Sequence, residues 1–512
     1  MLASQDRENS SQPSFQVKTS GVLIIVAVLL TALRVGLVVS EDPSPTEAYY
    51  FLCAEKSAPA YFDGPAGTAC LVGGLEALGL PEEAWRLLAP FWALAATLAC
   101  YLLLRRVGDD DLAAWAALGL NALPLVNTAA LRVGPELPAL TATALAMLFV
   151  WRAYHARSGK LLWWLAAAVM MGTASSFAYV TVAWVPALIV FVFCSPKHRK
   201  LDHVLGAGLF FLLPALMLGP ALAWNAALEW IPVAGGTLRT LLMFRIGGFF
   251  ISLGQLAMAF SPLVLVFMLL AWVRDGRESH REVRSRFLFL GALPGVVLCG
   301  YFALRGQAAG FPLLLAVPLL LLGFLKGNFR SGWKQAIPGA SFTVAVVMSA
   351  YSMMAVFQSG EGWRAAAGEV RDAFLEQSAA EGEGVFLVAG DPALASVLGY
   401  HLRNELVPPA GHPTVYVGES QDVSNQFGLW PSYGDFVATG HTTDEYFTEE
   451  EGENPFLGRS ALYISHEAAD DLPQTIKAAF VAVNLLEKLP PVGGDAEPLY
   501  IYQCLDYQTQ PL

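Results

Sequence analysis

Acidic and basic side chains that could act on a phosphorylated substrate lie in the polar connections between the long apolar segments of this chain. The acids are Glu41, Asp42, Glu47, Glu55, Asp63, Glu136 and Glu229, and the basic residues are Lys56, Arg86, Arg132, Arg239, Arg245 and Arg305. Arginine can bind a phosphate through two parallel hydrogen bonds, and a carboxylate can accept the proton of an attacking hydroxyl. The set fits group transfer from a phosphate-bearing donor. The alternative is a set of ordinary interfacial residues at helix ends.

Other kinds of chemistry have little support in the sequence. No His-x-x-x-His or Cys-x-x-Cys spacing suggests a metal site. The chain also lacks a phosphate-binding glycine loop and a dinucleotide fingerprint, which argues against a nucleotide donor from the cytosol. Cys53 and Cys70 share one polar connection, where an oxidising compartment would permit a disulfide. The alternative is that they are two unrelated small residues.

The elements that must position these residues are membrane helices. Of the 512 residues, 55% are hydrophobic and 14% are charged, whereas soluble globular proteins carry about 25% charged residues. This composition excludes a soluble enzyme, a disordered chain and a nucleic-acid binder. Apolar stretches of roughly 20 residues predict eleven spans, near 21–40, 85–104, 111–130, 136–153, 161–177, 179–194, 203–224, 250–273, 287–304, 309–325 and 335–357.

The distribution of Lys and Arg predicts the orientation, because basic loops are retained in the cytoplasm. With the N-terminus in the cytoplasm, the cytoplasmic connections hold sixteen basic residues and the opposite connections hold six. Eleven spans then place the C-terminal part outside. Residues 358–512 contain 24 acidic and 6 basic residues, as expected for a water-exposed domain.

Strand and helix patterns alternate in this acidic part and predict a small α/β domain with a core of its own. Helices are expected at 362–380 and 392–402, and strands at 385–389, 414–417, 460–465, 480–486 and 499–503. The acidic stretch 444–453 lacks the ligand spacing of a calcium loop and is interpreted as a solvated loop.

The sequence therefore predicts a mainly α polytopic membrane protein with a soluble C-terminal α/β domain. Residues 1–20 form a cytoplasmic tail, 21–357 the transmembrane domain, and 358–512 the extracytoplasmic domain. The outer connection 41–83 is too long for a turn. Its amphipathic stretch 46–58 and its Gly/Pro-interrupted stretch 61–80 are expected to be helices along the membrane surface. Long connections of this kind are usually functional.

An ordered series of short motifs runs through the chain. It contains Glu47-Ala48-Tyr49-Tyr50, Tyr61-Phe62-Asp63-Gly64-Pro65, Gly134-Pro135-Glu136-Leu137-Pro138, Trp224-Asn225 and Ser424-Asn425-Gln426-Phe427-Gly428-Leu429-Trp430. The series resembles the GT-C membrane glycosyltransferases, most closely family 39 with the bacterial aminoarabinose-transferase-like and RgtA/B/C/D-like group. The first two motifs correspond to Asp-Glu-Ala-Tyr-Tyr and Tyr-Phe-Asp-His-Pro-Pro in that group.

The resemblance implies transfer of a sugar from a polyprenyl-phosphate carrier to a lipid, glycan or protein acceptor. The reaction would take place on the outer face of the inner (plasma) membrane, with a divalent metal in some members. The resemblance implies a catalytic group of Glu47, Asp63 and Glu136, with Glu47 or Asp63 as the general base. Donor binding would fall to Tyr50, Arg132, Arg239, Arg245 and Arg305.

The sequence departs from the family where catalysis is expected. The leading Asp of the first motif is Thr46, the His after Asp63 is Gly64, and a family Lys is absent from Ser176-Phe177-Ala178-Tyr179. One alternative is therefore a catalytically degenerate homologue that binds a lipid-linked sugar or a partner protein. Another is a secondary transporter, for which Arg34 is the main charged residue inside a span.

Overall fold

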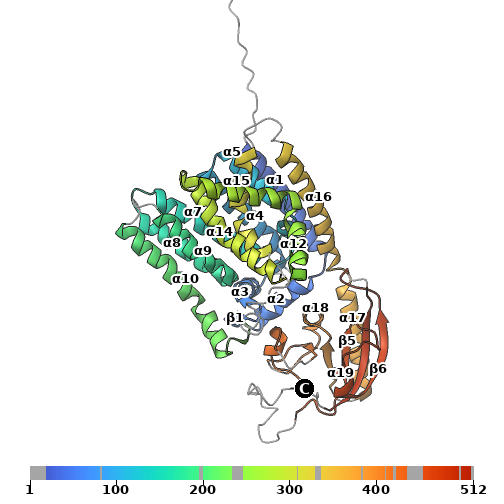
Figure 1. The fold of residues 1–512 in the computed structure, drawn as a ribbon. Coiled ribbons are helices and arrows are strands. Elements are labelled where there is room, and N and C mark those ends of the chain that lie inside the picture. The colour runs from blue at the N-terminus through green and yellow to red at the C-terminus, as the bar shows by residue number, and fades with distance from the viewer. Residues whose placement is uncertain are drawn as a thin grey trace, which may run out of the picture.

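The computed structural model describes residues 19–80, 84–194, 200–232, 246–307, 310–328, 336–381, 384–409, 411–418, 423–434, 454–494 and 497–508. A bundle of helices makes up most of the molecule, and a smaller domain containing a β-sheet lies at one end of it (Figure 1). Arg239, Arg245 and the acidic stretch 444–453 lie outside the described residues.

Within the described residues, seven helical segments are long and apolar enough to cross a membrane. They comprise α1 (Thr19–Ser40), the 3₁₀ turn η1 (Ala84–Leu87) with α4 (Leu88–Val107), α7 (Glu136–His155), α10 (Leu201–Ala227), α14 (Val283–Leu304), α15 (Gly310–Asn328) and a segment that starts with α16 (Ala336–Gln358). Each matches a predicted span. The chain is therefore an integral membrane protein.

The predicted span 250–273 is a broken helix instead of a straight one. Helices α12 (Ile246–Phe260) and α13 (Pro262–Glu278) meet at an angle of 98°. Ser261 between them has a φ of 65°, and Pro262 lacks the N–H that would continue the hydrogen bonding of α12 but suits the first turn of a new helix. Counted as one span, this pair brings the number to eight.

Shorter helices occupy the other three predicted spans. These helices are α5 (Asp110–Asn121), α6 (Pro124–Ala129), α8 (Lys160–Phe177) and α9 (Trp184–Phe193), the last one preceded by the 3₁₀ turn η2 (Tyr179–Ala183). Pro124 separates α5 from α6, because proline starts a helix more readily than it continues one. The count of eleven spans stays a prediction.

Helices α7 and α15 form the centre of the bundle, and their membrane-crossing segments are mostly buried. Alanine recurs along α7 at Ala139, Ala142, Ala144 and Ala146, all of them buried, and such small side chains allow neighbouring membrane helices to approach closely. By contrast, α1, α10 and α16 have largely exposed apolar surfaces. They are the helices that can face lipid.

The long outer connection contains less helix than the sequence predicts. Helix α2 (Pro45–Glu55) corresponds to the amphipathic stretch 46–58, but strands β1 (Ala60–Tyr61) and β2 (Gly64–Pro65) form an antiparallel hairpin before α3 (Gly67–Ala77) begins. Gly64 at the turn has a φ of 155°, a value that favours glycine. The hairpin places Asp63 at its tip.

The C-terminal domain is built around a five-stranded mixed sheet with strand order β4-β3-β5-β7-β6. Its elements are α17 (Trp363–Glu381), β3 (Phe386–Ala389), α18 (Pro392–Leu402), β4 (Tyr416–Val417), η5 (Gln426–Leu429), β5 (Ala461–Ser465), α19 (Gln474–Ala479), β6 (Phe480–Leu489) and β7 (Leu499–Tyr507). Strand β3 runs parallel to β4 and β5, whereas β7 runs antiparallel to β5 and β6. The predicted α/β domain is thus present, with longer final strands.

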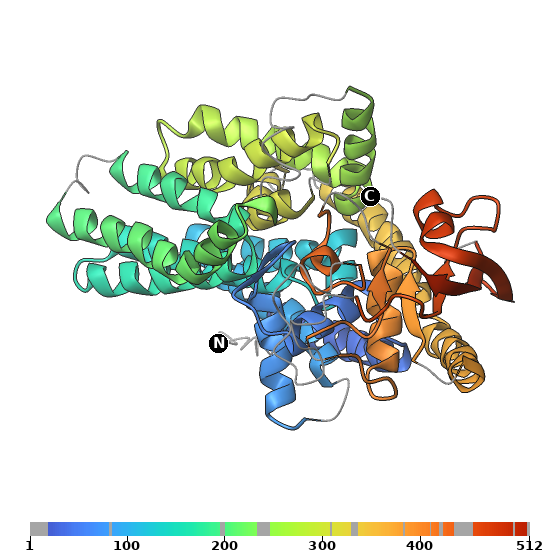
Figure 2. The same ribbon diagram turned by 90° about the horizontal axis from the view of Figure 1, so that it is seen from below.

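One hydrophobic core is shared by the C-terminal domain and the first outer connection. Phe51 of α2 contacts Tyr400 of α18, with ring centroids 5.0 Å apart, and Trp85 of η1, at 5.6 Å. The same buried cluster contains Val370 of α17 and Leu387 of β3. Viewed from below, the orange segments of the C-terminal domain lie beside the blue N-terminal helices (Figure 2). The domain is therefore packed against the membrane body through α2.

Candidate functional site

The carboxylate of Glu47 is fully engaged at the start of α2. Its Oε2 atom accepts hydrogen bonds from the backbone N–H and the hydroxyl of Ser44, at 3.1 and 2.9 Å. This is a capping box, in which the third helical residue satisfies the backbone at the helix start. The Oε1 atom lies 3.3 Å from Nε of Arg86, and both side chains are buried. Little of the carboxylate is left to accept a proton from a substrate.

Arg86 connects this ion pair to the end of the first span. Its guanidinium donates to the carbonyl oxygens of Glu41 and Asp42. The cavity beside Glu47 and Arg86 has a volume of only ≈ 20 Å³, which is about enough for one water molecule and far too small for a sugar. The contacts describe a buried anchor between α1, α2 and η1.

A second group of polar side chains surrounds Tyr50 on α2. Burial raises the pKa of Tyr50 well above its ordinary value, and the negative charges of Glu136 and Asp63 raise it further. The neighbouring Tyr49 has its pKa raised by burial, by Cys53 and by Asp63. Asp63 is exposed at the hairpin tip, and Glu136 is half-buried at the first position of α7. The fold thus brings Asp63 and Glu136, which are 73 residues apart in the sequence, within electrostatic reach of Tyr50.

Arg132 supplies a positive charge next to these acids. Burial lowers the pKa of its guanidinium, and the nearby carboxylates of Glu47 and Glu136 oppose that effect. One terminal nitrogen donates to the hydroxyl of Ser359 at 2.6 Å. The buried Nε atom has no hydrogen-bond partner among the described residues. Arg132 therefore retains one unpaired donor, which is buried.

The hairpin that bears Asp63 is held by the C-terminal domain. The backbone N–H of Phe62 donates to Oε1 of the buried Gln426 at 2.7 Å. At the C-terminal end of α2, just before the hairpin, the Lys56 ammonium donates to the carbonyl oxygens of Gly411 and His412, at 2.6 and 2.8 Å. Gln426 of the C-terminal domain thus holds the hairpin that bears Asp63.

Arg305 is buried at the C-terminal end of α14. Its guanidinium donates to the Tyr301 hydroxyl at 3.3 Å and lies over the Tyr301 ring, 5.6 Å from the centroid. These contacts are with its own helix and do not join Arg305 to the Tyr50 group. Its role in donor binding stays a prediction, as do those of Arg239 and Arg245.

The described residues can be searched for a metal site and for the disulfide between Cys53 and Cys70. No group of three or more His, Cys, Asp or Glu side chains that could hold a metal ion occurs among them. Cys53 is buried, Cys70 is exposed, and both are free thiols. A divalent metal stays an expectation from the resemblance alone.

Arg34, the charged residue inside the first span, is held by hydrogen bonds to two asparagine side chains. It is buried, and its guanidinium donates to Oδ1 of Asn127 at 2.6 Å and to Oδ1 of Asn121 at 3.2 Å. A charge inside a membrane must be paired or hydrogen-bonded, and these two amides provide the partners. Arg34 joins α1 to α5 and α6, which gives no support to a transport pathway.

Comparisons with known proteins bear on the fold. Residues 63–224 match the sequence family described as dolichyl-phosphate-mannose-protein mannosyltransferase. The structure of ArnT from Cupriavidus metallidurans bound to undecaprenyl phosphate is similar, with a TM-score of 0.59, 14% sequence identity, and coverage of 94% of this chain and 97% of that one. The chain has the GT-C fold. No curated protein sequence matches it significantly.

Two further GT-C structures show the same likeness. ArnT from Cupriavidus metallidurans in the apo state has a TM-score of 0.58 at 13% identity, with coverage of 94% of this chain and 98% of that chain. The apo oligosaccharyltransferase from Archaeoglobus fulgidus has a TM-score of 0.52 at 12% identity and covers 86% of this chain and 69% of that chain. The matched family segment of this GT-C chain includes Asp63, Arg132 and Glu136.

Sequence reasoning missed two residues that organise this candidate site. Arg86 appears in the sequence only as one of six outer basic residues, and nothing marks it as the partner of Glu47. Gln426 belongs to a recognised motif, yet its contact with Phe62 spans more than 360 residues. The Ser44-x-x-Glu47 spacing was an available signal, because it is the signature of a capping box.

Proposed function

We propose that this GT-C chain is a membrane glycosyltransferase that moves a sugar from a polyprenyl-phosphate carrier to a lipid, glycan or protein acceptor. We place the reaction on the outer face of the inner (plasma) membrane, with the C-terminal domain extracytoplasmic. The observation that carries the proposal is the cluster of Tyr50, Asp63, Glu136 and Arg132 between the membrane body and the C-terminal domain. The undecaprenyl phosphate named for the similar ArnT structure supports a carrier of this class.

Within this proposal Asp63 is the general base and Arg132 binds the carrier phosphate. Asp63 is exposed and lies within electrostatic reach of Tyr49 and Tyr50, so an acceptor hydroxyl can reach it. Glu47 is buried and saturated with hydrogen bonds, which supports an anchoring role in preference to proton transfer. Glu136 adds negative charge near the anomeric centre, where it would stabilise a developing positive charge.

A degenerate homologue that binds a lipid-linked sugar or a partner protein is the second candidate. One observation favours it: Thr46, at the family's leading acidic position, is exposed on α2, and its hydroxyl cannot replace a carboxylate base. The two candidates make opposite predictions for turnover. They make the same prediction for carrier binding if the degenerate homologue binds a lipid-linked sugar.

Transfer assays with a panel of radiolabelled polyprenyl-phosphate sugars test the proposal, with the full-length protein in lipid nanodiscs. Asp63→Asn is expected to lower the rate about 100- to 10,000-fold while carrier binding and thermal stability are retained. Glu47→Gln is the matched control, expected to lower stability together with activity. Normal turnover by Asp63→Asn would exclude Asp63 as the base. Carrier binding without turnover for any sugar in the wild-type protein would favour the degenerate homologue.

A further inference from the structure

The end of the helical bundle opposite to the C-terminal domain has a wide polar hollow of ≈ 900 Å³. Helix α7 runs from one end of the bundle to the other. Its first residue, Glu136, belongs to the proposed transfer site, and its last residue, His155, lines the hollow. At a rise of 1.5 Å per residue, the two are about 28 Å apart. The hollow is therefore separate from the proposed transfer site.

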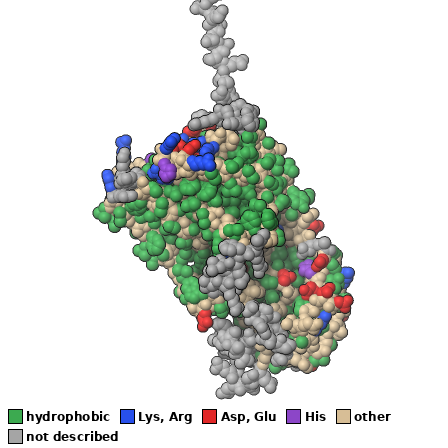
Figure 3. Space-filling view, in the orientation of Figure 1, with side chains coloured by type: hydrophobic (Ala, Val, Ile, Leu, Met, Phe, Trp, Pro, Cys, Tyr) green, Lys and Arg blue, Asp and Glu red, His purple; other side chains and the backbone are tan. Residues whose placement is uncertain are grey.

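Three arginines from three different helices line this hollow. They are Arg106 of α4, Arg152 of α7 and Arg284 of α14. None of them forms an ion pair with a carboxylate in the described part of the chain. Basic side chains and histidine gather at this end of the helical body, with some acidic side chains among them (Figure 3). Within the described residues, no carboxylate lies within ion-pair distance of these three arginines, although Glu282 of the same lining is close enough to Arg284 to interact with it electrostatically.

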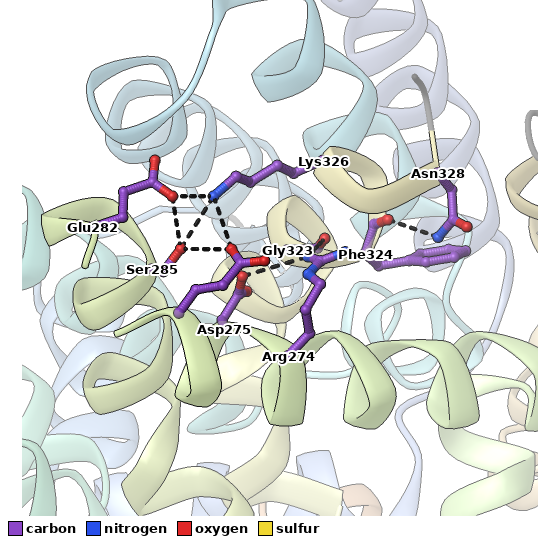
Figure 4. A network of polar contacts seen from close by, with 9 residues as sticks. Arg274, Asp275, Glu282, Ser285, Gly323, Phe324, Lys326 and Asn328 are labelled. Carbon is purple, nitrogen blue, oxygen red and sulfur yellow. Dashed lines mark hydrogen bonds and ion pairs between the residues drawn. The ribbon is translucent and has the colours of Figure 1, made fainter. Parts of the chain in front are cut away.

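Glu282 is the one carboxylate of the hollow's lining, and its charge is already neutralised. Its Oε2 atom accepts hydrogen bonds from the Lys326 ammonium at 2.7 Å and from the Ser285 hydroxyl at 2.9 Å. Figure 4 shows this network next to Arg274, which pairs with Asp275 and donates to the carbonyl of Gly323. Glu282 and Asp275 are thus paired with Lys326 and Arg274.

Aromatic and aliphatic side chains extend the hollow toward the membrane. The guanidinium of Arg152 lies over the ring of Trp163, 4.7 Å from its centroid, and Trp151 also belongs to the lining. Leu161 and Leu162, next to Trp163 on α8, are 46% and 67% exposed. Tryptophan favours the interface between headgroups and acyl chains, and the exposed leucines offer a surface for the chains.

We infer that this hollow is a binding site for a phosphate group of an anionic lipid in the leaflet opposite to the proposed transfer site. Arg106, Arg152 and Arg284 bind the phosphate oxygens through charge-assisted hydrogen bonds, and Trp163 and the adjacent leucines contact the acyl chains. Basic pockets between membrane helices are a general form of headgroup recognition. A soluble phosphate ester shares the headgroup chemistry but not the chains.

Native mass spectrometry of the full-length protein with dioleoyl phosphatidylglycerol and dioleoyl phosphatidylcholine tests the inference. Each arginine near a membrane surface contributes about 1 kcal/mol to binding an anionic lipid, or roughly fivefold. Arg152→Gln with Arg284→Gln is expected to weaken phosphatidylglycerol binding about 25-fold. The control pair, Arg277→Gln with Arg281→Gln, removes two exposed arginines outside the lining and leaves binding unchanged.

Two further arms complete the experiment. Arg106→Gln alters an exposed side chain, so it tests the site with a roughly fivefold loss even if the double variant fails to fold. Retention of the lipid in the presence of excess glycerol 3-phosphate assigns the site to a membrane lipid, and displacement assigns the same pocket to a soluble ester. Equal losses in the control pair, or equal binding of phosphatidylcholine, would overturn the inference.

Discussion

Nε of Arg86 lies 3.3 Å from Oε1 of Glu47, and the two side chains are 4% and 1% exposed. Removing one partner of such a buried pair leaves a charge without compensation, which costs about 3–5 kcal/mol. The pair also fixes the start of α2. Glu47 accepts hydrogen bonds from the backbone N–H and the hydroxyl of Ser44, and Arg86 donates to the carbonyl oxygens of Glu41 and Asp42. Glu47 matches a family acid in the first motif, but because it is buried and paired with Arg86, our proposal gives it a structural role.

We therefore predict that Glu47→Gln lowers thermal stability in proportion to its effect on activity. The amide keeps the shape of the carboxylate but leaves the Arg86 charge unpaired, so we expect a loss of about 3 kcal/mol. The melting temperature of the protein in detergent measures it. Arg105→Gln is the control, because its pair with Asp110 is exposed and should contribute less than about 1 kcal/mol. Lost transfer at an unchanged melting temperature would return the catalytic role to Glu47.

A second prediction concerns the hydrogen bond between Phe62 and Gln426. Gln426→Leu leaves the Phe62 N–H without its acceptor and frees the hairpin that bears Asp63. Displacing a reacting group by about 1 Å can lower the rate roughly 100-fold, so we expect a fall in kcat with a smaller change in carrier binding. Gln426→Glu retains an acceptor oxygen and should preserve most of the rate. Equal rates for Gln426→Leu and Gln426→Glu would show that the C-terminal domain does not position Asp63.

The pH dependence of stability should reveal the lowered pKa of His401 in α18. Burial lowers the pKa of this imidazole to about 4, from an ordinary value of 6.5. Between pH 6.5 and 4, His401 is protonated in the unfolded chain but stays neutral in the folded protein. The free energy of unfolding therefore falls as the pH falls through this window, and it levels off below pH 4. The loss is on the order of 2–3 kcal/mol.

Melting temperatures of the wild-type protein and His401→Gln at pH 7.5 and 4.5 measure this effect. The wild-type protein should lose more stability than the variant on acidification, since only the wild type carries the imidazole. His280→Gln changes an exposed histidine at the other end of the bundle and serves as the control. An identical pH dependence in all three proteins would mean that His401 is protonated in the folded state.

Two native cysteines can test the predicted orientation. Cys70 on α3 and Cys194 at the end of α9 are both exposed, and the distribution of basic residues predicts that they lie on opposite sides of the membrane. A membrane-impermeant thiol reagent added to intact cells should label Cys70 and not Cys194. Cys70→Ser should abolish the signal, and Cys194→Ser should leave it unchanged. Labelling of Cys194 alone would reverse the topology.

Much of the fold could be predicted from hydropathy and local pattern. The seven long helices match predicted spans, and helix 392–402 of the C-terminal domain coincides with α18. The break at Ser261 could not be read from hydropathy, because a backbone angle separates two segments that are equally apolar. The hairpin at Gly64 was missed because its strands are only two residues long.

The motifs predicted Asp63, Glu136, Tyr50 and Arg132 as site residues, and their roles stay predictions. The structure places Asp63 and Glu136 within electrostatic reach of Tyr50, and Glu136 within electrostatic reach of Arg132. Sequence motifs identify which side chains are present, whereas their partners depend on contacts between distant segments. Glu47 illustrates the difference, since its hydrogen bond to Ser44 is local but its ion pair with Arg86 spans 39 residues.

The packing of α2 on α18 also sets an order of events during synthesis. Helix α2 ends at Glu55, and α18 begins at Pro392, more than 330 residues later. At translation rates of 5–20 residues per second, α2 waits roughly 20–70 s for its partner to leave the ribosome. The hairpin that bears Asp63 waits even longer for Gln426. A chain that ends after α16 but before this point can insert its spans, yet it lacks the partner that holds the hairpin, so the proposed site stays incomplete.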